Sequence, residues 1–144
     1  MIFQEMKIED LEEVVLLEDL CFSSPWNKEN CKYEIEENPF SHGWILVDED
    51  KIVGYAFLWE TFEMAQLARI GIQPRLRKKG YASFLMEKLI ERARSVDCEY
   101  MTLEVRASNE AGLALYKKMG FIQVNVSKNY YPDGEDAIVM TLAL

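Results

Sequence analysis

The feature that most constrains the fold is a change of apolar periodicity around Gly80. Leu67–Ile72 is a short apolar run of the kind found in buried strands, and Pro74 ends it. From Gly80 onward the apolar residues recur at helical spacing for about fourteen residues, which indicates an amphipathic helix. A strand and a helix that each carry an apolar face bury those faces against each other. The sequence therefore predicts a mixed α/β fold.

Similar patterns divide the rest of the chain. They predict strands at about 2–6, 44–47, 52–59, 101–105, 121–126 and 137–142, and helices at about 8–20, 28–37 and 109–119. Ser108 or Asn109 is suited to cap the last helix. The chain has 144 residues and no repeat or linker-like segment, so we expect residues 1–144 to form one domain around one sheet.

The cellular setting follows from what the sequence lacks. No run approaches the ~20 apolar residues of a membrane span, and no secretory signal precedes the first strand. Three cysteines, Cys21, Cys31 and Cys98, are odd in number and lack metal-ligand spacing. We therefore expect a cytoplasmic protein with reduced thiols, no metal site and no membrane partner.

The formal net charge of −9 is unevenly distributed. Residues 1–63 carry 16 acids and 4 bases, whereas residues 64–144 carry 9 acids and 12 bases. Five of those bases lie within the eleven residues Arg69–Lys79, with no acid among them. An acidic protein does not attract nucleic acid through its overall field, but it can hold a local anion and attract a cation elsewhere.

The segment Arg77–Ala82 (Arg-Lys-Lys-Gly-Tyr-Ala) is the strongest candidate for an anion site. It joins a predicted strand to a predicted helix, whose first N–H groups are unpaired and lie at the positive end of the helix dipole. A phosphate group finds several donors there, and Gly80 and Ala82 let it approach the main chain. The alternative is a solvated basic turn. The segment is neither a Walker A loop nor a dinucleotide fingerprint.

This segment resembles the R/Q-x-x-G-x-G/A motif of the GNAT superfamily of N-acetyltransferases. Further segments resemble the ribosomal-protein alanine N-acetyltransferases of the RimI type: Cys21–Trp26, Leu103–Asn109, Ala114–Tyr116, Gly120-Phe121, Asn129–Pro132 and Glu135–Ala137. With the predicted elements, the resemblance covers nearly the whole chain. It implies the GNAT fold: a single mixed, mostly antiparallel sheet with central splayed parallel strands, flanked by about four helices.

The resemblance also implies acetyl-CoA as cosubstrate, with no metal. In such enzymes the CoA pyrophosphate lies on the backbone amides of the motif loop, and the pantetheine arm pairs with the preceding strand. Carried over to this chain, the strand positions are Ile70, Gly71 and Ile72, and Gly71 is expected to mark a bulge where the parallel strands splay. The loop positions are Arg77, Lys78, Lys79, Gly80, Tyr81, Ala82 and Ser83. Asn109 matches a position that contacts the pantetheine arm, besides being a possible helix cap.

Two residues receive catalytic roles by the same resemblance. Glu104 is the base that deprotonates the acceptor amine, and Tyr116 is the acid beside the departing thiol of CoA. A free α-amine has a pKa near ~7.7–8.0, so a modest base suffices. The alternatives are that Glu104 is a solvated strand residue and that Tyr116 only packs.

The acceptor side is expected outside the loop. Trp26, Tyr130, Tyr131 and Asp136 match positions that line it in similar proteins, and simple core packing is the alternative for Trp26 and Tyr130. Two positions depart from the family pattern. Met64 replaces a usual acid, whose role the neighbouring Glu63 is a candidate to assume. Arg69 replaces a usual Asn and is expected to add a charge near the cleft.

The leading hypothesis is transfer of an acetyl group from acetyl-CoA to a protein N-terminus, by direct attack in a ternary complex. The acceptor implied by the resemblance is the N-terminal alanine of a small-subunit ribosomal protein. The alternatives are an acetyltransferase acting on a small amine, a polyamine or a lysine side chain, and a CoA-binding module without turnover. A nucleic-acid partner is not expected, because the basic cluster is short and no aromatic stripe accompanies it. The sequence leaves the oligomeric state open.

Overall fold

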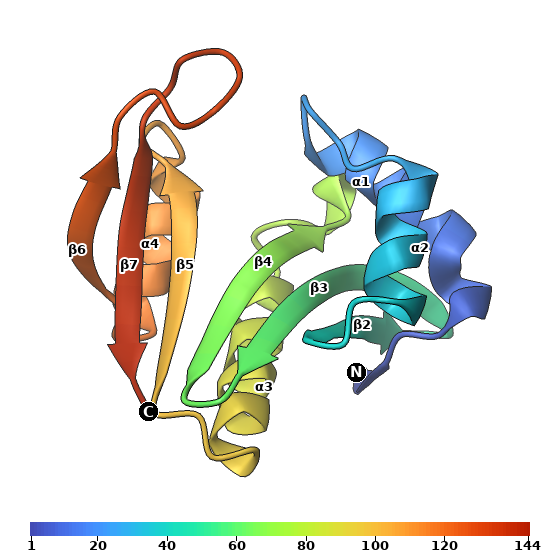
Figure 1. The fold of residues 1–144 in the computed structure, drawn as a ribbon. Coiled ribbons are helices and arrows are strands. Elements are labelled where there is room, and N and C mark those ends of the chain that lie inside the picture. The colour runs from blue at the N-terminus through green and yellow to red at the C-terminus, as the bar shows by residue number, and fades with distance from the viewer.

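The computed structural model describes residues 1–144 and contains one seven-stranded sheet (Figure 1). The strands are β1 (Ile2–Glu5), β2 (Ser41–Asp48), β3 (Lys51–Thr61), β4 (Met64–Ile72), β5 (Tyr100–Arg106), β6 (Ile122–Ser127) and β7 (Ala137–Ala143). Their order across the sheet is β1-β2-β3-β4-β5-β7-β6, and only β4 and β5 are parallel neighbours. This confirms the predicted mixed, mostly antiparallel sheet.

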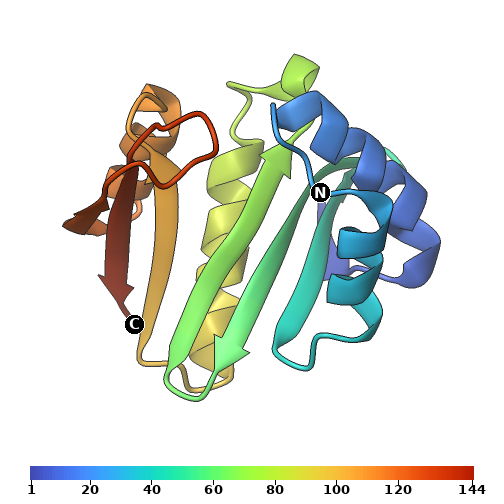
Figure 2. The same ribbon diagram turned by 45° about the horizontal axis from the view of Figure 1, so that its top comes forward.

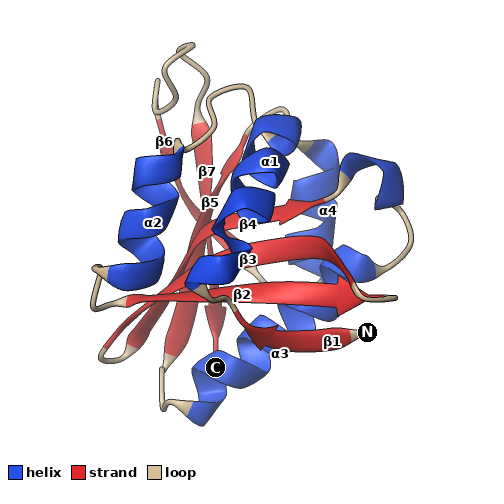
Figure 3. Ribbon diagram, turned by 90° about the vertical axis from the view of Figure 1, so that its right-hand side faces the viewer, coloured by secondary structure: helices blue, strands red, loops and turns tan.

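Helices cover both faces of this sheet (Figure 3). They are α1 (Leu11–Cys21), α2 (Lys28–Glu36), α3 (Tyr81–Ser95) and α4 (Glu110–Lys118), with 3₁₀ turns at Ile8–Asp10 and Pro74–Leu76. Because side chains alternate along a strand, β3 serves two cores. Tyr55 and Phe57 pack with α1 and α2, whereas Ala56 and Leu58 belong to the core that α3 and α4 cover. No helix is long and apolar enough to cross a lipid bilayer.

The predicted elements are all present, and the differences lie at their ends. The helix expected from residue 8 starts as a 3₁₀ turn and becomes α-helical at Leu11. The strands expected from Trp44 and Leu67 begin at Ser41 and Met64. Pairing with β3 extends both strands, through the polar residues Ser41 and His42 in β2 and across the polar Gln66 in β4.

The parallel strands β4 and β5 separate toward one end. They pair only from Met64 to Leu67, opposite Tyr100 to Leu103. Beyond this stretch β4 remains paired with β3 and β5 with β7, while the two ribbons diverge (Figure 2). The predicted splay is therefore confirmed. It leaves the edges of β4 and β5 that face each other without strand partners.

The bulge associated with this splay is not at Gly71, where the sequence analysis placed it. Phe57 pairs with Arg69 and Leu58 with Leu67, so the extra residue in β4 is Ala68. Gly71 pairs regularly with Tyr55. A Cβ atom at Gly71 would lie 2.7 Å from a carbon of the Tyr55 ring. The absence of a side chain at position 71 is thus explained by the close approach of the Tyr55 ring to the backbone of β4.

A fully buried carboxylate, Glu18 of α1, connects α1 to the sheet. Arg69 of β4 binds it through Nε, 3.1 Å from both carboxylate oxygens, and through Nη2, 3.0 Å from Oε1. The Tyr55 hydroxyl donates to Oε2, and the Trp26 backbone N–H donates to Oε1 at 2.8 Å. The Arg69 guanidinium also stacks on the Phe22 ring, with Cζ 3.9 Å from its centroid. These contacts fix the α1–α2 connection against β3 and β4.

Removing the arginine tests this connection. We expect Arg69→Met to lower the free energy of unfolding by about 3–5 kcal/mol, because it leaves the Glu18 charge buried without a cationic partner. The double variant Glu18→Gln/Arg69→Met should lose less, since no charge is then buried. Urea unfolding at pH 7 measures both. A double variant that is no more stable than Arg69→Met would contradict the ion-pair explanation.

Candidate active site

The N-terminus of α3 is open to an anion. Its N-cap residue, Gly80, has a φ of +87° and no side chain to cap the helix. The first backbone bond of the helix runs from the Phe84 N–H to the Gly80 carbonyl. The N–H groups of Tyr81, Ala82 and Ser83 therefore lack intrahelical partners. The helices α2 and α4, by contrast, are capped by Asn27 and Asn109. This geometry fits a diphosphate group on the α3 amides.

The basic side chains near this helix start do not all serve the same site. Arg77, Lys78 and Lys79 are exposed beside the amides, where they add positive charge. The Arg69 charge acts on Tyr131: burial raises the pKa of Tyr131, and Arg69 opposes part of that rise. Its guanidinium, however, pairs with Glu18. The charge that Arg69 was expected to add near the cleft is therefore balanced.

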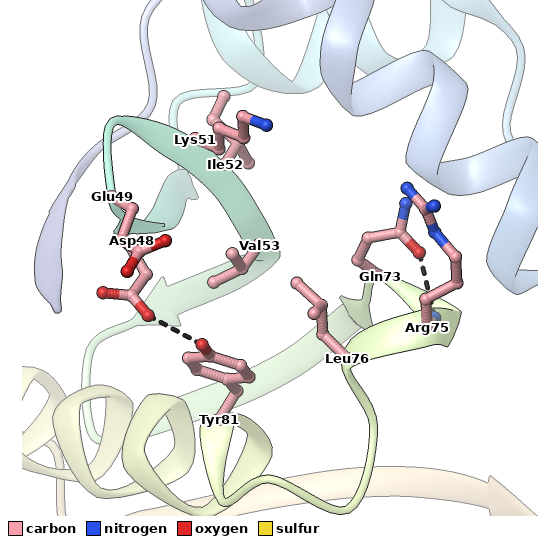
Figure 4. Close-up of a pocket in the computed structure, with 9 residues that line it drawn as sticks. All are labelled: Asp48, Glu49, Lys51, Ile52, Val53, Gln73, Arg75, Leu76 and Tyr81. Carbon is pink, nitrogen blue, oxygen red and sulfur yellow. Dashed lines mark hydrogen bonds between the residues drawn. The ribbon is translucent and has the colours of Figure 1, made fainter.

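The side chain of Tyr81 turns away from the diphosphate site. Its hydroxyl donates to Asp48 Oδ2 at 2.7 Å, across a cavity of about 430 Å³ (Figure 4). The cavity is lined by residues of the β2–β3 turn and of the segment before α3: Asp48, Glu49, Lys51, Ile52, Val53, Gln73, Arg75, Leu76 and Tyr81. No residue of β5 or α4 lines it. At the start of α3, Tyr81 therefore leaves only its backbone N–H unpaired, because its side chain is bonded to Asp48.

The unpaired edge of β4 lies next to this anion site. Ile70, Gly71 and Ile72 are bonded to β3 on one side and have no strand partner on the side toward β5. An extended amide chain can therefore pair with this edge as a further strand would. Part of the edge is already engaged, because the Cys21 thiol donates to the Ile72 carbonyl at 3.3 Å.

Glu104 of β5 faces the same splayed region. It is partly buried, and its Oε2 atom is buried without a hydrogen-bond partner. Two tyrosines of the β6–β7 loop lie close by. The neighbouring Glu104 carboxylate, together with burial, raises the pKa of Tyr130 to about 12. Burial and the Glu104 charge raise the pKa of Tyr131. Glu104 is therefore not simply a solvated strand residue.

Tyr116 of α4 belongs to the opposite face of β5. It is 7% exposed and packs edge-on against Phe121, with ring centroids 5.9 Å apart. Leu103 and Val105, the strand neighbours of Glu104, lie in the same core as Tyr116. Burial raises the pKa of Tyr116 to about 12, so its hydroxyl keeps its proton at neutral pH. A protonated hydroxyl is the form that a general acid requires.

Arg106 holds the β6–β7 loop in place. Its Nη1 atom lies 2.9 Å from both Asp133 Oδ2 and Glu135 Oε1. Its Cζ atom lies 4.1 Å from the centroid of the Tyr131 ring. Glu135 also accepts the Ser108 N–H at 2.7 Å. β5 therefore carries both Glu104 and Arg106, and Arg106 orders the loop that holds Tyr130 and Tyr131.

The remaining acceptor-side candidates differ in their surroundings. Trp26 is half-buried and packs on Phe57, with ring centroids 5.5 Å apart. Tyr130 is 53% exposed, so core packing is the wrong explanation for it. Asp136 accepts the Asn129 N–H at 2.9 Å, and thereby shapes the start of the β6–β7 loop.

Three further positions have specific structural places. Asn109 caps α4 by accepting the Gly112 N–H at 2.9 Å, as predicted for its capping role. Met64 pairs with Tyr100 at the end of β4 where the strands are joined. Glu63 lies at that same end, where its carbonyl accepts the N–H groups of Glu99 and Tyr100. Neither Met64 nor Glu63 is at the splayed end with Glu104.

The sequence analysis missed Glu18 and Arg106. For Glu18 a signal existed, because it follows Leu11 and Val14 at helical spacing and so lies on the apolar side of its helix. For Arg106 no local signal existed. Its acidic partners are 27 and 29 residues away in the chain.

Comparisons with known proteins identify the family of this chain. A family model described as the acetyltransferase (GNAT) family matches residues 11–121. A Bacillus subtilis (strain 168) protein, provisionally named [ribosomal protein bS18]-alanine N-acetyltransferase, is 34% identical over 142 residues, or 98% of this chain and 94% of the relative. The Escherichia coli (strain K12) [ribosomal protein bS18]-alanine N-acetyltransferase is 31% identical over 138 residues, covering 94% and 92%. The crystal structure of the Escherichia coli ribosomal-protein-S18-alanine N-acetyltransferase superposes with a TM-score of 0.91 at 29% identity, covering 99% of this chain and 92% of that one.

The basic residues before α3 can be tested by binding. We expect Lys78→Gln/Lys79→Gln to weaken the binding of CoA about three- to thirtyfold, because each of the two exposed charges contributes on the order of 0.3–1 kcal/mol. The matched control is Lys117→Gln/Lys118→Gln at the end of α4. Isothermal titration calorimetry gives both dissociation constants. Equal constants for the two double variants would show that overall charge, not the loop, governs binding.

Proposed function

Because this chain belongs to the acetyltransferase (GNAT) family, we propose that its acceptor is the α-amine of a protein N-terminus, with alanine as the preferred first residue. The chain is an acetyl-CoA-dependent N-acetyltransferase. The observation that supports this acceptor most directly is Glu104, whose unpartnered carboxylate oxygen lies at the splay beside Tyr130 and Tyr131. The names of the relatives make the N-terminal alanine of a small-subunit ribosomal protein the leading acceptor. Residues 1–144 act as one catalytic domain in this proposal.

In this proposal two regions of the chain hold the cosubstrate. The amides of Tyr81–Ser83, with Arg77–Lys79 around them, hold the diphosphate. The pantetheine arm pairs with the free edge of β4 at Ile70–Ile72 and contacts Asn109. Acetyl-CoA then supplies an acyl group already activated as a thioester.

Proton movements are assigned to the two residues on opposite faces of β5. Glu104 accepts the proton of the incoming ammonium group, which frees its lone pair to form the new C–N bond. As the C–S bond breaks, Tyr116 donates its proton to the departing thiolate, and the new amide nitrogen releases its remaining extra proton to water. Burial raises the pKa of Tyr116 to about 12, so the hydroxyl still carries its proton when the thiolate leaves. No acyl-enzyme step is required.

The acceptor terminus enters, in this proposal, between the α1–α2 connection and the β6–β7 loop. Trp26 lies on one side and Tyr130 and Tyr131 on the other. Both walls are rigidly supported, the first by the Glu18–Arg69 pair and the second by Arg106. Asp136 contributes by ordering the loop and not by contacting the amine.

A panel of acceptors tests the proposed function. We expect peptides that begin with alanine to be acetylated, because the tyrosine-walled approach to Glu104 suits a chain terminus. Mass spectrometry of the products locates the acetyl group on the α-amine. Free spermidine and peptides with a blocked N-terminus and one internal lysine are the comparison substrates. If spermidine or the lysine peptide is acetylated and the alanine peptides are not, while CoA binding is intact, the result would favour an amine acetyltransferase of another specificity.

The base role of Glu104 predicts a characteristic pH dependence. Glu104→Gln should lower kcat/KM about 100-fold near pH 6.5, where the α-amine is protonated and needs a base. The deficit should narrow above about pH 8.5, because the free amine then predominates. Steady-state rates across this range measure the effect.

Tyr116→Phe is the contrasting variant for that measurement. Because burial raises the pKa of Tyr116 to about 12, its hydroxyl stays protonated across this pH range. Removing the hydroxyl should therefore lower kcat by the same factor at every pH. A Glu104→Gln deficit that is the same at every pH would remove Glu104 from the role of base.

A further inference from the structure

A second cavity, of about 340 Å³, lies between α2 and the sheet. We call it the aromatic pocket. Its lining is aromatic and polar: Trp26, Asn30, Tyr33, Glu34, Asn38 and Trp59. Its volume is at the lower end of the ~300–1,000 Å³ typical of small-ligand pockets, so it suits one side chain better than a whole cofactor.

Glu34 is the unusual member of this pocket. It is 5% exposed, yet no Lys, Arg or His nitrogen forms an ion pair with it. Its oxygens accept one hydrogen bond each, from Trp59 Nε1 at 2.6 Å and from Asn38 Nδ2 at 2.8 Å. A carboxylate offers about four acceptor positions, so capacity remains on both oxygens. A buried negative charge without a counter-charge is costly, and a cation would compensate it.

Two other shielded carboxylates of the chain have such a cation. Glu18, which is fully buried, pairs with Arg69. Glu60, whose side chain is 10% exposed, pairs with Arg92 at 2.9 Å. Of these three carboxylates, Glu34 alone has no cationic partner, and it lines the aromatic pocket. The missing positive charge therefore has a place to enter from outside.

We propose that the aromatic pocket binds the guanidinium or ammonium group of a basic side chain near the N-terminus of the acceptor polypeptide. Glu34 supplies the charge, and the faces of Trp26, Tyr33 and Trp59 attract a cation as aromatic rings do. The surrounding residues 1–63 carry 16 acids and 4 bases, which favours a basic acceptor at longer range. This inference rests on the proposed function, because it assigns a second contact to the same acceptor.

The register of the sheet places the pocket within reach of Glu104. Trp59 pairs with Gln66 across β3 and β4, and Gln66 pairs with Thr102 across β4 and β5. Paired residues project on the same face, and Glu104 follows Thr102 by two residues on that face. Two strand spacings and two residues give a separation of roughly 12 Å. An extended chain covers that distance in roughly three to four residues, so the basic side chain belongs at about position three to five.

Matched peptides test this assignment. Each begins with alanine and carries either arginine or its neutral isostere citrulline at position 3, 4, 5 or 8. The measured quantity is the ratio of kcat/KM for the arginine peptide to that for the citrulline peptide. In the unmodified protein we expect a ratio of about ten or more at one of positions 3 to 5, as for a hydrogen-bonded charge pair, and a ratio near one at position 8.

Three variants locate the effect. Glu34→Gln should reduce the ratio to within about twofold of one, whereas the exposed neighbour Glu37→Gln should leave it unchanged. Tyr33→Leu, which alters no hydrogen bond to Glu34, should reduce it about threefold through the lost aromatic face. Thermal unfolding, together with continued turnover of the citrulline peptides, verifies that each variant is folded.

Several outcomes overturn the inference. A ratio near one at every position in the unmodified protein would show that the pocket takes no side chain of the acceptor. An equal fall in Glu37→Gln and Glu34→Gln would assign the preference to the general acidic field. Acetylation of citrulline peptides in either case leaves the proposed function intact. Failure to acetylate any peptide, with CoA still bound, contradicts the proposed function and this inference together.

Discussion

The buried pair of Glu18 and Arg69 is the contact on which the acceptor side of the molecule depends. A fully buried carboxylate is tolerated only with a close cation and further donors, and Arg69, Tyr55 and the Trp26 N–H provide them. These groups come from α1, β3, β4 and the α1–α2 connection. Satisfying one charge therefore fixes four segments relative to one another. Trp26 owes its place beside the sheet to that requirement.

The second constraint is the splay of β4 and β5, which sets backbone and side-chain groups aside for ligands. The bulge at Ala68 and the short pairing of Met64–Leu67 leave an open β4 edge. The uncapped start of α3 has free amides, and Glu104 has an oxygen without a partner. The concentration of these unpaired groups in one region is the structural basis of the proposed substrate site.

The comparison of Arg69 with Arg77–Lys79 shows how far sequence reasoning reaches. The loop residues lie between β4 and α3, where a local motif and a change of periodicity placed them. Arg69 belongs to the same basic run in sequence, and it was expected to charge the cleft. Its partner is 51 residues away, and no local pattern reports a pairing at that separation. The same limit hid the contacts of Arg106, and it misplaced the bulge by three residues.

The sequence by itself determined the mixed α/β architecture, the order of the elements and the position of the basic loop before α3. These features depend on local periodicity, capping and motif residues, which are properties of neighbouring positions. Only the tertiary structure decided which charges neutralise each other and which remain available. It paired Glu18 with Arg69, left Glu34 unpaired beside a cavity, and set Tyr116 and Glu104 on opposite faces of β5. The physical reason is that burial and ion pairing arise between segments far apart in the chain, once the sheet brings them together.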